Sequence, residues 1–186
     1  MRHRTVAVIL ATGGGPMVKA AHSSGKPALG VGTGNAVTIV DVTANTDEVA
    51  DKIMRSNTFD FGTSCSTENS CLVHESMAAQ MKASFEKAGA YLVPSSEKAK
   101  FQKAYWPDGV HLNKDIVAQS PQRIAELAGI KLPEGKTFFV VEETGIGEGY
   151  PFSGEKLSAT LAMYTYKDFD QAIDMVNRIT SFSGPG

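Results

Sequence analysis

A continuous apolar run in the last third of the chain most strongly limits the folds open to this sequence. Phe138, Phe139, Val140 and Val141 follow one another without the polar–apolar alternation of a strand that has one face in water. Such runs are typical of strands covered on both faces, which occur in parallel sheets with helices above and below. Other short apolar runs alternate along the chain with segments of helical periodicity. The sequence therefore predicts an α/β fold with a largely parallel sheet flanked by helices.

Capping residues and glycines divide the chain into the elements of such a fold. Asn45 and Glu48 have the spacing of a capping box in front of a helical apolar pattern. Ser120 and Pro121 open a later helix, and Gly129 is placed to end it. The predicted strands cover residues 6–10, 27–31, 37–40, 70–73, 91–93, 136–142 and 160–166. The predicted helices cover residues 16–24, 46–58, 77–88, 96–105, 121–128 and 168–180, and residues 143–156 are expected to be irregular.

The last predicted helix shows the amphipathic pattern of a helix that packs on a sheet. Its apolar residues Phe169, Ala172, Ile173 and Val176 fall on one face by their spacing.

The length and charge of the chain exclude several classes of protein. Its 186 residues can form one ordinary domain or two small ones, with a real core. The 18 Lys and Arg against 20 Asp and Glu give a formal net charge of −2, and no basic block restores the positive surface that nucleic-acid binding needs. No apolar run reaches about 18 residues, so we expect no membrane-spanning segment.

The N-terminus and the cysteines indicate a compartment. Residues 1–15 are basic and then apolar, but the apolar stretch is short and ends in glycines, so we do not interpret it as a signal peptide. Cys65 and Cys71, the two cysteines of the sequence, cannot form a disulfide framework. A reducing cytoplasm is therefore the simpler location.

The 18 glycines gather in a few clusters, and one of them is placed to bind a ligand. Residues 12–15 connect a predicted strand to a predicted helix, where open α/β sheets bind ligands and a helix N-terminus offers N–H groups to an anion. A tight turn without a ligand explains these residues equally well. The clusters at residues 30–35 and 145–150 miss the spacing of a dinucleotide-binding loop, and no cluster matches a Walker loop.

The two cysteines lie in different settings. Cys71 lies within a predicted strand, where a cysteine behaves as a small buried apolar residue. Cys65 lies in a loop of small polar residues, whose exposed N–H groups would favour a thiolate and an oxyanion beside it. A loop cysteine without a chemical role is the more common case, so both interpretations stay open at this point.

The other residues that could carry chemistry form no known constellation. The four histidines are scattered, and none pairs with Cys, His or a carboxylate at ligand spacing, so we expect no metal site. Ser153 lacks the G-x-S-x-G spacing of a nucleophile elbow. Glu155, considered alone, is an ordinary surface carboxylate.

Three segments, in this order along the chain, resemble the aldehyde dehydrogenase superfamily. Residues 9–14 (ILATGG) are similar to the strand and turn that pass beneath the nicotinamide half of NAD in that family. Residues 59–65 (FDFGTSC) are similar to its nucleophile segment, and residues 155–158 (EKLS) to the segment whose glutamate holds the nicotinamide ribose. The likeness runs through essentially the whole chain. It implies an aldehyde dehydrogenase-like catalytic domain with the tail end of a Rossmann-type cofactor domain.

A fourth segment resembles the CoA-acylating branch of that superfamily. In the hydrolytic enzymes a Glu-Leu-Gly-Gly stretch supplies the glutamate that activates water, and here the matching residues are Ala-Leu-Gly-Val, with Ala28 in place of that glutamate. Alanine cannot accept a proton, so water would lack its general base, whereas a thiol loses its proton more readily. The resemblance therefore implies coenzyme A as the acyl acceptor.

The resemblance also implies residue roles. The Cys65 thiolate adds to the carbonyl carbon of a short aldehyde, its backbone N–H helps to hold the oxyanion, and the resulting thioester is passed to CoA. NAD, or NADP, is the implied hydride acceptor. The implied cofactor-binding residues are Thr12, Gly13, Gly14, Leu29, Gly30, Glu155 and Leu157. The resemblance implies an acetaldehyde-like substrate by default, and the local sequence is also similar to that of sulfoacetaldehyde dehydrogenases.

The chain is much shorter than proteins of that family. By the resemblance, residues 1–30 are the C-terminal remnant of the cofactor-binding domain, and residues 31–186 are a catalytic domain truncated at its C-terminal end. We therefore expect poor NAD binding and little activity from this chain alone, and a homo-oligomer for the full-length family. The alternative hypothesis is a truncated, non-catalytic fragment that retains the fold and an assembly surface.

Overall fold

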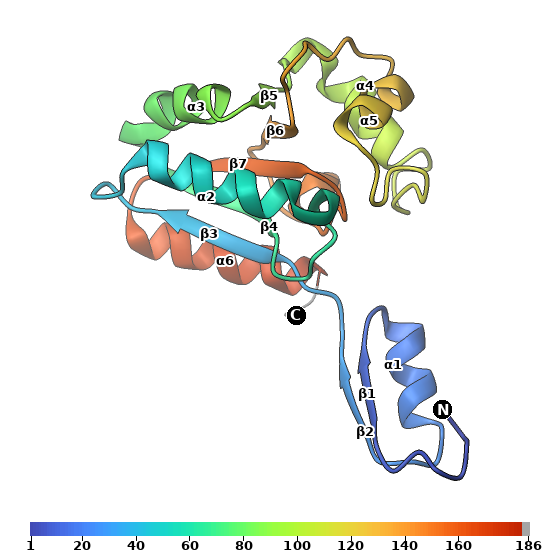
Figure 1. The fold of residues 1–186 in the computed structure, drawn as a ribbon. Coiled ribbons are helices and arrows are strands. Elements are labelled where there is room, and N and C mark those ends of the chain that lie inside the picture. The colour runs from blue at the N-terminus through green and yellow to red at the C-terminus, as the bar shows by residue number, and fades with distance from the viewer. Residues whose placement is uncertain (184–186) are drawn as a thin grey trace.

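Two parallel sheets organise the chain in the computed structural model, which describes residues 1–183 (Figure 1). A small sheet pairs β1 (Ile9–Thr12) with β2 (Ala28–Val31), and α1 (Gly15–His22) connects these two strands. A second sheet has five strands in the order β3-β4-β7-β6-β5, and every neighbouring pair in it is parallel. The predicted α/β fold is confirmed.

The remaining elements follow one another in β–α alternation. The strands of the large sheet are β3 (Ala36–Val40), β4 (Glu68–His74), β5 (Ala90–Leu92), β6 (Phe138–Glu142) and β7 (Thr160–Tyr166). The other helices are α2 (Thr46–Thr58), α3 (Ala78–Lys87), α4 (Ser95–Tyr105), α5 (Pro121–Ala128) and α6 (Phe169–Ser183), with single 3-10 turns at Phe59–Gly62, Glu75–Met77 and Pro151–Ser153. Among residues 1–183, no helix is both long and apolar enough to cross a membrane.

Strand β6 is covered on both faces, as its apolar run predicts. Phe138 and Val140 pack into a core cluster with side chains of α2 and α3. Phe139 and Val141 pack into a second cluster with side chains of α4, α5 and α6. In Figure 1, α2 passes in front of β4 while α6 lies behind β3, so the two clusters fill opposite sides of the sheet.

The predicted helix caps are present. The Asn45 side chain accepts hydrogen bonds from the backbone N–H groups of Asp47 and Glu48, at 3.1 and 3.3 Å. The Ser120 hydroxyl accepts one from the N–H of Arg123 at 3.3 Å, at the start of α5. Two of the otherwise unpaired N–H groups at the start of α2 are therefore satisfied.

The first strand is displaced from its predicted position. The predicted strand is present, but its expected bounds of residues 6–10 are wrong, because β1 runs from Ile9 to Thr12. Its hydrogen-bonding partner β2 begins at Ala28, opposite Ile9, directly after Pro27. Residues before Ile9 therefore have no neighbouring strand to pair with.

The packed face of α6 also differs from the prediction. Phe169 and Ile173 are 58% and 42% exposed, whereas Ala172, Met175 and Ile179 are buried. Of the four residues predicted to share one face, Ala172 and Val176 pack into the core, whereas Phe169 and Ile173 do not. Two apolar stripes overlap on this helix. The stripe that packs against the sheet contains Ala172, Met175 and Ile179, which are spaced three and four residues apart.

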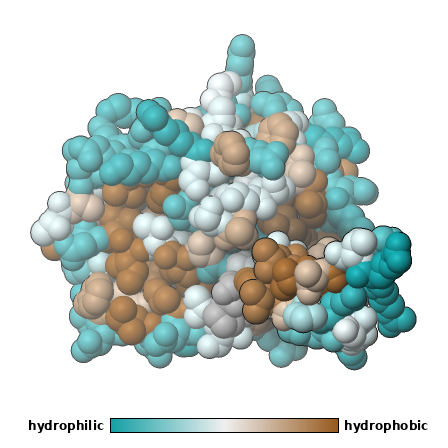
Figure 2. Space-filling view, turned by 60° about the horizontal axis from the view of Figure 1, so that its bottom comes forward, coloured by the Kyte–Doolittle hydropathy of each residue, from teal (hydrophilic) through white to brown (hydrophobic). Residues whose placement is uncertain are grey.

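The small sheet has an apolar core of its own, formed by Ile9, Ala11 and Ala21. On its other face, the register partners Leu10 and Leu29 are 75% and 66% exposed. Figure 2 shows a face of the molecule on which apolar side chains gather in patches among hydrophilic ones. Among the described residues β1 and β2 pair only with each other, so each leaves an unpaired edge.

Candidate active site

A cavity of about 620 Å³ opens where the small sheet faces the large one. Four chain segments meet there: the end of β1 with its glycines, residues 31–34 between β2 and β3, the loop after α2, and the stretch before β7. Six of the eight predicted site residues line it, namely Thr12, Gly13, Gly14, Cys65, Glu155 and Leu157. The other lining residues are Val31, Gly32, Thr33, Gly34, Thr63 and Ser66. The fold thus brings together residues that lie up to 145 positions apart in the sequence, from Thr12 to Leu157.

Leu29 and Gly30 do not line this cavity. The Leu29 side chain points to the exposed face of the small sheet. Gly30 faces α1 instead, because a Cβ added to it would be 2.5 Å from Val18 and 2.9 Å from the ring of His22. These two residues therefore sit in β2 just before the stretch that does reach the cavity.

That stretch, residues 31–34, supplies site residues that the sequence does not identify. It connects β2 of the small sheet to β3 of the large one and forms a wall of the cavity. The signal was the glycine-rich cluster at residues 30–35, which matches no ligand-binding spacing. Only the placement of the two sheets shows why small residues are needed there.

The loop that carries Cys65 has an unusual backbone. Asp60 and Phe61 have positive φ angles of 49° and 51° in the 3-10 turn after α2. Gly62 follows with a φ of 70° and lies directly against the backbone of Ser158. Non-glycine residues rarely adopt such angles unless the surrounding structure holds them. The sharp reversal ends α2 and directs the next residues toward the cavity.

The two cysteines differ as the sequence predicts. Cys65 is exposed at the cavity, whereas Cys71 is buried in β4. Burial raises the pKa of the Cys71 thiol to about 12. Because the thiolate is the nucleophilic form, Cys71 is unreactive at neutral pH, and Cys65 is the cysteine that a ligand can reach.

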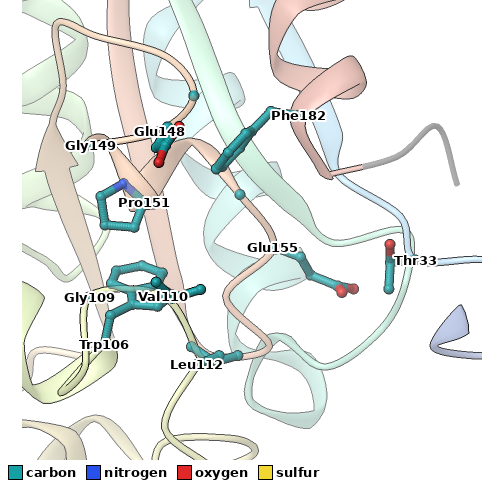
Figure 3. A pocket seen from close by; sticks show the side chains of 12 residues that line it. Thr33, Trp106, Gly109, Val110, Leu112, Glu148, Gly149, Pro151, Glu155 and Phe182 are labelled. Carbon is teal, nitrogen blue, oxygen red and sulfur yellow. The ribbon is translucent and has the colours of Figure 1, made fainter. Parts of the chain in front are cut away.

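Glu155 lies on the boundary between this cavity and a second one of about 490 Å³. In Figure 3 its carboxylate points toward Thr33, and these two residues belong to both cavities. Apolar side chains of the second cavity include Trp106, Val110 and Phe182. Burial raises the pKa of the Glu155 carboxyl, and the neighbouring Lys156 ammonium opposes that rise.

The residues around the first cavity fit a nicotinamide nucleotide. The glycines leave room along the walls of the cavity. Gly13 has a φ of 148°, and a Cβ added there would lie only 3.2 Å from the sulfur of Met17. A half-buried carboxylate such as that of Glu155 can accept two hydrogen bonds from a ribose diol. Val31 and Leu157 offer apolar surface to a ring. Within residues 1–183, no group of three His, Cys, Asp or Glu is placed to hold a metal ion.

Comparison with known proteins gives consistent matches. The model of the aldehyde dehydrogenase family matches residues 1–100. The chain is 41% identical over 185 residues to a sulfoacetaldehyde dehydrogenase (acylating) of Cupriavidus necator, covering 98% of this chain and 37% of that protein. Other curated relatives are longer still, and the chain spans only 21% of the first of them.

Solved structures of aldehyde dehydrogenases have the same fold as this chain. An acetylating aldehyde dehydrogenase from Geobacillus thermoglucosidasius superimposes with a TM-score of 0.93 at 43% identity, over 98% of this chain and 40% of that one. A propionaldehyde dehydrogenase from Rhodopseudomonas palustris, solved with bound CoA and an acylated cysteine, superimposes with a TM-score of 0.87 at 26% identity, over 96% of this chain and 40% of that one. With its family match over more than half of its length, its parallel sheet and its cysteine-lined cavity, this chain belongs to the aldehyde dehydrogenase family.

Proposed function

We propose that this chain is the nucleophile-bearing portion of a CoA-acylating aldehyde dehydrogenase that uses NAD or NADP. The observation that carries the proposal is the meeting of exposed Cys65, Glu155 and the Thr12–Gly14 turn at one cavity. In this proposal Cys65 is the nucleophile, and Thr12, Gly13, Gly14, Glu155 and Leu157 contact the cofactor in the cavity. Leu29 and Gly30, which do not line the cavity, would contribute backbone contacts beside it. Because the Leu29 side chain points to the exposed face of the small sheet, Leu29 would contact the cofactor through its backbone.

The chemistry begins at the Cys65 sulfur. The thiolate forms a C–S bond to the aldehyde carbon, and the carbonyl electron pair moves onto oxygen, where the Cys65 N–H donates a hydrogen bond. A nicotinamide cofactor, when bound, supplies the acceptor for the hydride that leaves the same carbon. Glu155 orients the ribose, and Cys65 is left as a thioester. The CoA thiol gives its proton to solvent and forms a new C–S bond to the acyl carbon, and the C–S bond to Cys65 breaks to release the Cys65 thiolate.

The side chain at position 28 supports CoA rather than water as the acyl acceptor. Ala28 packs against the core of the small sheet and carries no group that could take a proton from water. The acylated cysteine and bound CoA of the Rhodopseudomonas palustris enzyme, and the acylating name of the Cupriavidus necator relative, agree with this chemistry. We therefore propose a short aldehyde as substrate, either acetaldehyde-like or sulfoacetaldehyde.

The proposed division of the chain follows the two sheets. Residues 1–30 would be the end of a cofactor-binding domain, and residues 31–186 a catalytic domain. The separate apolar core of the small sheet supports a division close to residue 31. A cytoplasmic location and a homo-oligomeric whole protein are part of the proposal.

The test is the reverse reaction, NADH oxidation that depends on an acyl-CoA, followed at the nicotinamide absorbance. We expect slow turnover that is lost in Cys65→Ala and kept in Cys71→Ala, whose cysteine is buried away from the cavity. Acetyl-CoA and sulfoacetyl-CoA, compared directly, separate the two substrate classes. A folded chain without any turnover would favour the alternative, a non-catalytic piece that keeps the fold.

A further inference from the structure

Lys156 is a buried lysine that the proposed chemistry does not use. Its side chain is fully enclosed, and its ammonium donates hydrogen bonds to the backbone oxygens of Phe152 and Gly154, at 2.8 and 2.9 Å. Its backbone N–H donates to the side-chain oxygen of Asn69 at 3.0 Å. Buried lysines are rare in folded proteins unless a specific set of acceptors holds them. Here the acceptors are carbonyl groups of the chain just before Lys156.

These acceptors belong to a buried turn whose carbonyl groups need partners. Phe152, Ser153 and Gly154 are all buried, and the oxygen of Ser153 accepts a hydrogen bond from the side chain of Asn35 at 2.8 Å. Two side chains, Lys156 and Asn35, thus satisfy three successive carbonyl groups. A buried carbonyl without a partner is costly, so the turn depends on both.

The aromatic side chain of the turn is anchored separately. The ring of Phe152 packs against Phe101, Tyr105 and Trp106 of α4 and its C-terminal end, with centroid separations of 5.9, 5.8 and 4.9 Å. The side chain is therefore held by the core, while the backbone that leads on to Glu155 is held by Lys156.

The residue between the clamped carbonyls and the clamping lysine is Glu155. Gly154 precedes it, Lys156 follows it, and Leu157 continues with a φ of 45°, an angle that restricts the path of the backbone further. The Lys156 side chain thus closes a short loop, residues 152–156. Glu155 lies at the tip of this loop and faces the boundary of the two cavities.

We propose that Lys156 is a positioning residue that holds the turn Phe152–Gly154 so that the Glu155 carboxylate can receive the ribose of a nicotinamide nucleotide. The inference rests on the proposed function, because it gives Glu155 the role of ribose acceptor. Lys156 itself does not line the cavity, so it acts through Glu155.

The clamp does not require the lysine to be charged. Burial lowers the pKa of Lys156 to about 7, while Glu155 and the buried Glu143, itself paired with Lys98 at 2.9 Å, favour the charged form. A neutral amine still carries two N–H groups, and two carbonyl oxygens accept from this nitrogen. The positioning role therefore holds on both sides of neutral pH.

Reduced nicotinamide mononucleotide is the probe, because it carries the nicotinamide and its ribose but not the adenosine half. Its Kd is measured by its fluorescence in the wild-type chain, Lys156→Met, Glu155→Gln and the double variant. Reduced 1-methylnicotinamide, which lacks the ribose, is the matched ligand. Ser84→Ala is the matched protein control, because the buried Ser84 hydroxyl donates to Thr46 and Asp47 far from the cavity.

We expect Lys156→Met and Glu155→Gln each to weaken binding of the mononucleotide about tenfold, the size of one lost hydrogen bond to a charged group. Neither should change the Kd of the ligand without ribose, and Ser84→Ala should change neither Kd. The double variant should lose no more than Glu155→Gln alone, because Lys156 acts through Glu155. Additive losses, or loss of both ligands alike, would overturn the positioning role.

A second measurement covers the case in which Lys156→Met does not fold. In the ¹H–¹⁵N spectrum of the wild-type chain, the Lys156 Nζ signal, assigned with Lys156→Arg, should be protected from exchange and should shift with the mononucleotide only. A signal that does not respond overturns the inference. If the wild-type chain binds neither ligand, the proposed cofactor site itself is overturned, and the positioning role with it.

Discussion

Gly62 is in direct contact with the backbone of Ser158, since a Cβ built on Gly62 would lie 2.5 Å from the Ser158 carbonyl oxygen and 2.6 Å from its carbonyl carbon. This contact joins the loop that carries Cys65 to the stretch that carries Glu155. Ser158 is held in turn by Tyr105, whose hydroxyl lies 3.0 Å from the Ser158 hydroxyl and 2.6 Å from that of Thr160. The spacing of the two proposed functional residues is therefore set by a glycine.

Gly62→Ala should both destabilise the protein and disturb the loop that carries Cys65. The substitution places a methyl group against backbone, which cannot move aside, at a φ of 70° that disfavours alanine. We expect a loss of about 2–4 kcal/mol in the free energy of unfolding, measured in urea. Gly135→Ala is the control, because Gly135 has a φ of 80° and open space around it, and it should cost clearly less. Equal losses in the two variants would contradict a steric role for the contact.

The two cysteines should differ strongly in alkylation by iodoacetamide. In the folded chain at pH 8 we expect Cys65 to react at least about a hundredfold faster than Cys71, because Cys71 is buried and its pKa is raised to about 12. Peptide mapping by mass spectrometry gives the two rates. In urea the two rates should converge. Comparable rates in the folded chain would contradict this account of the site.

Removing the Asn45 cap should weaken α2 by a modest, defined amount. Asn45→Ala leaves the N–H groups of Asp47 and Glu48 without their side-chain acceptor, so we expect a loss of about 1 kcal/mol in the free energy of unfolding. Asn45→Asp, which keeps an acceptor and adds negative charge at the helix N-terminus, should restore most of it. If Asn45→Asp is as unstable as Asn45→Ala, the cap is not the cause.

Much of the fold could be predicted because its signals are local. The bounds of β7 agree with the prediction at both ends, since Thr160–Tyr166 is a continuous β-prone run. The end of α5 was equally clear, because Gly129 adopts the left-handed conformation that stops a helix. The two covered faces of β6 follow from its four successive apolar residues.

The rest depends on contacts between distant parts of the chain. No local pattern shows that β6 pairs with both β5 and β7, or that residues 31–34 cross from one sheet to the other beside Cys65. The positive φ angles of Asp60 and Phe61 are held by tertiary packing against residue propensity. The same limit applies to Lys156, because nothing in the sequence distinguishes it from a lysine on the surface.

The buried Lys156 should leave a signature in the pH dependence of stability. Burial lowers its pKa from 10.5 to about 7 in the folded chain, whereas the unfolded chain keeps the ordinary value. Between these two values the unfolded state binds more protons than the folded one, so the free energy of unfolding rises with pH, by up to about 1.4 kcal/mol per pH unit. Lys156→Met has no such proton to lose. Urea unfolding at pH 6.5, 8 and 9 should therefore show the wild type gaining stability relative to Lys156→Met as pH rises, and a difference that stays constant with pH would show that Lys156 is not desolvated in the folded chain.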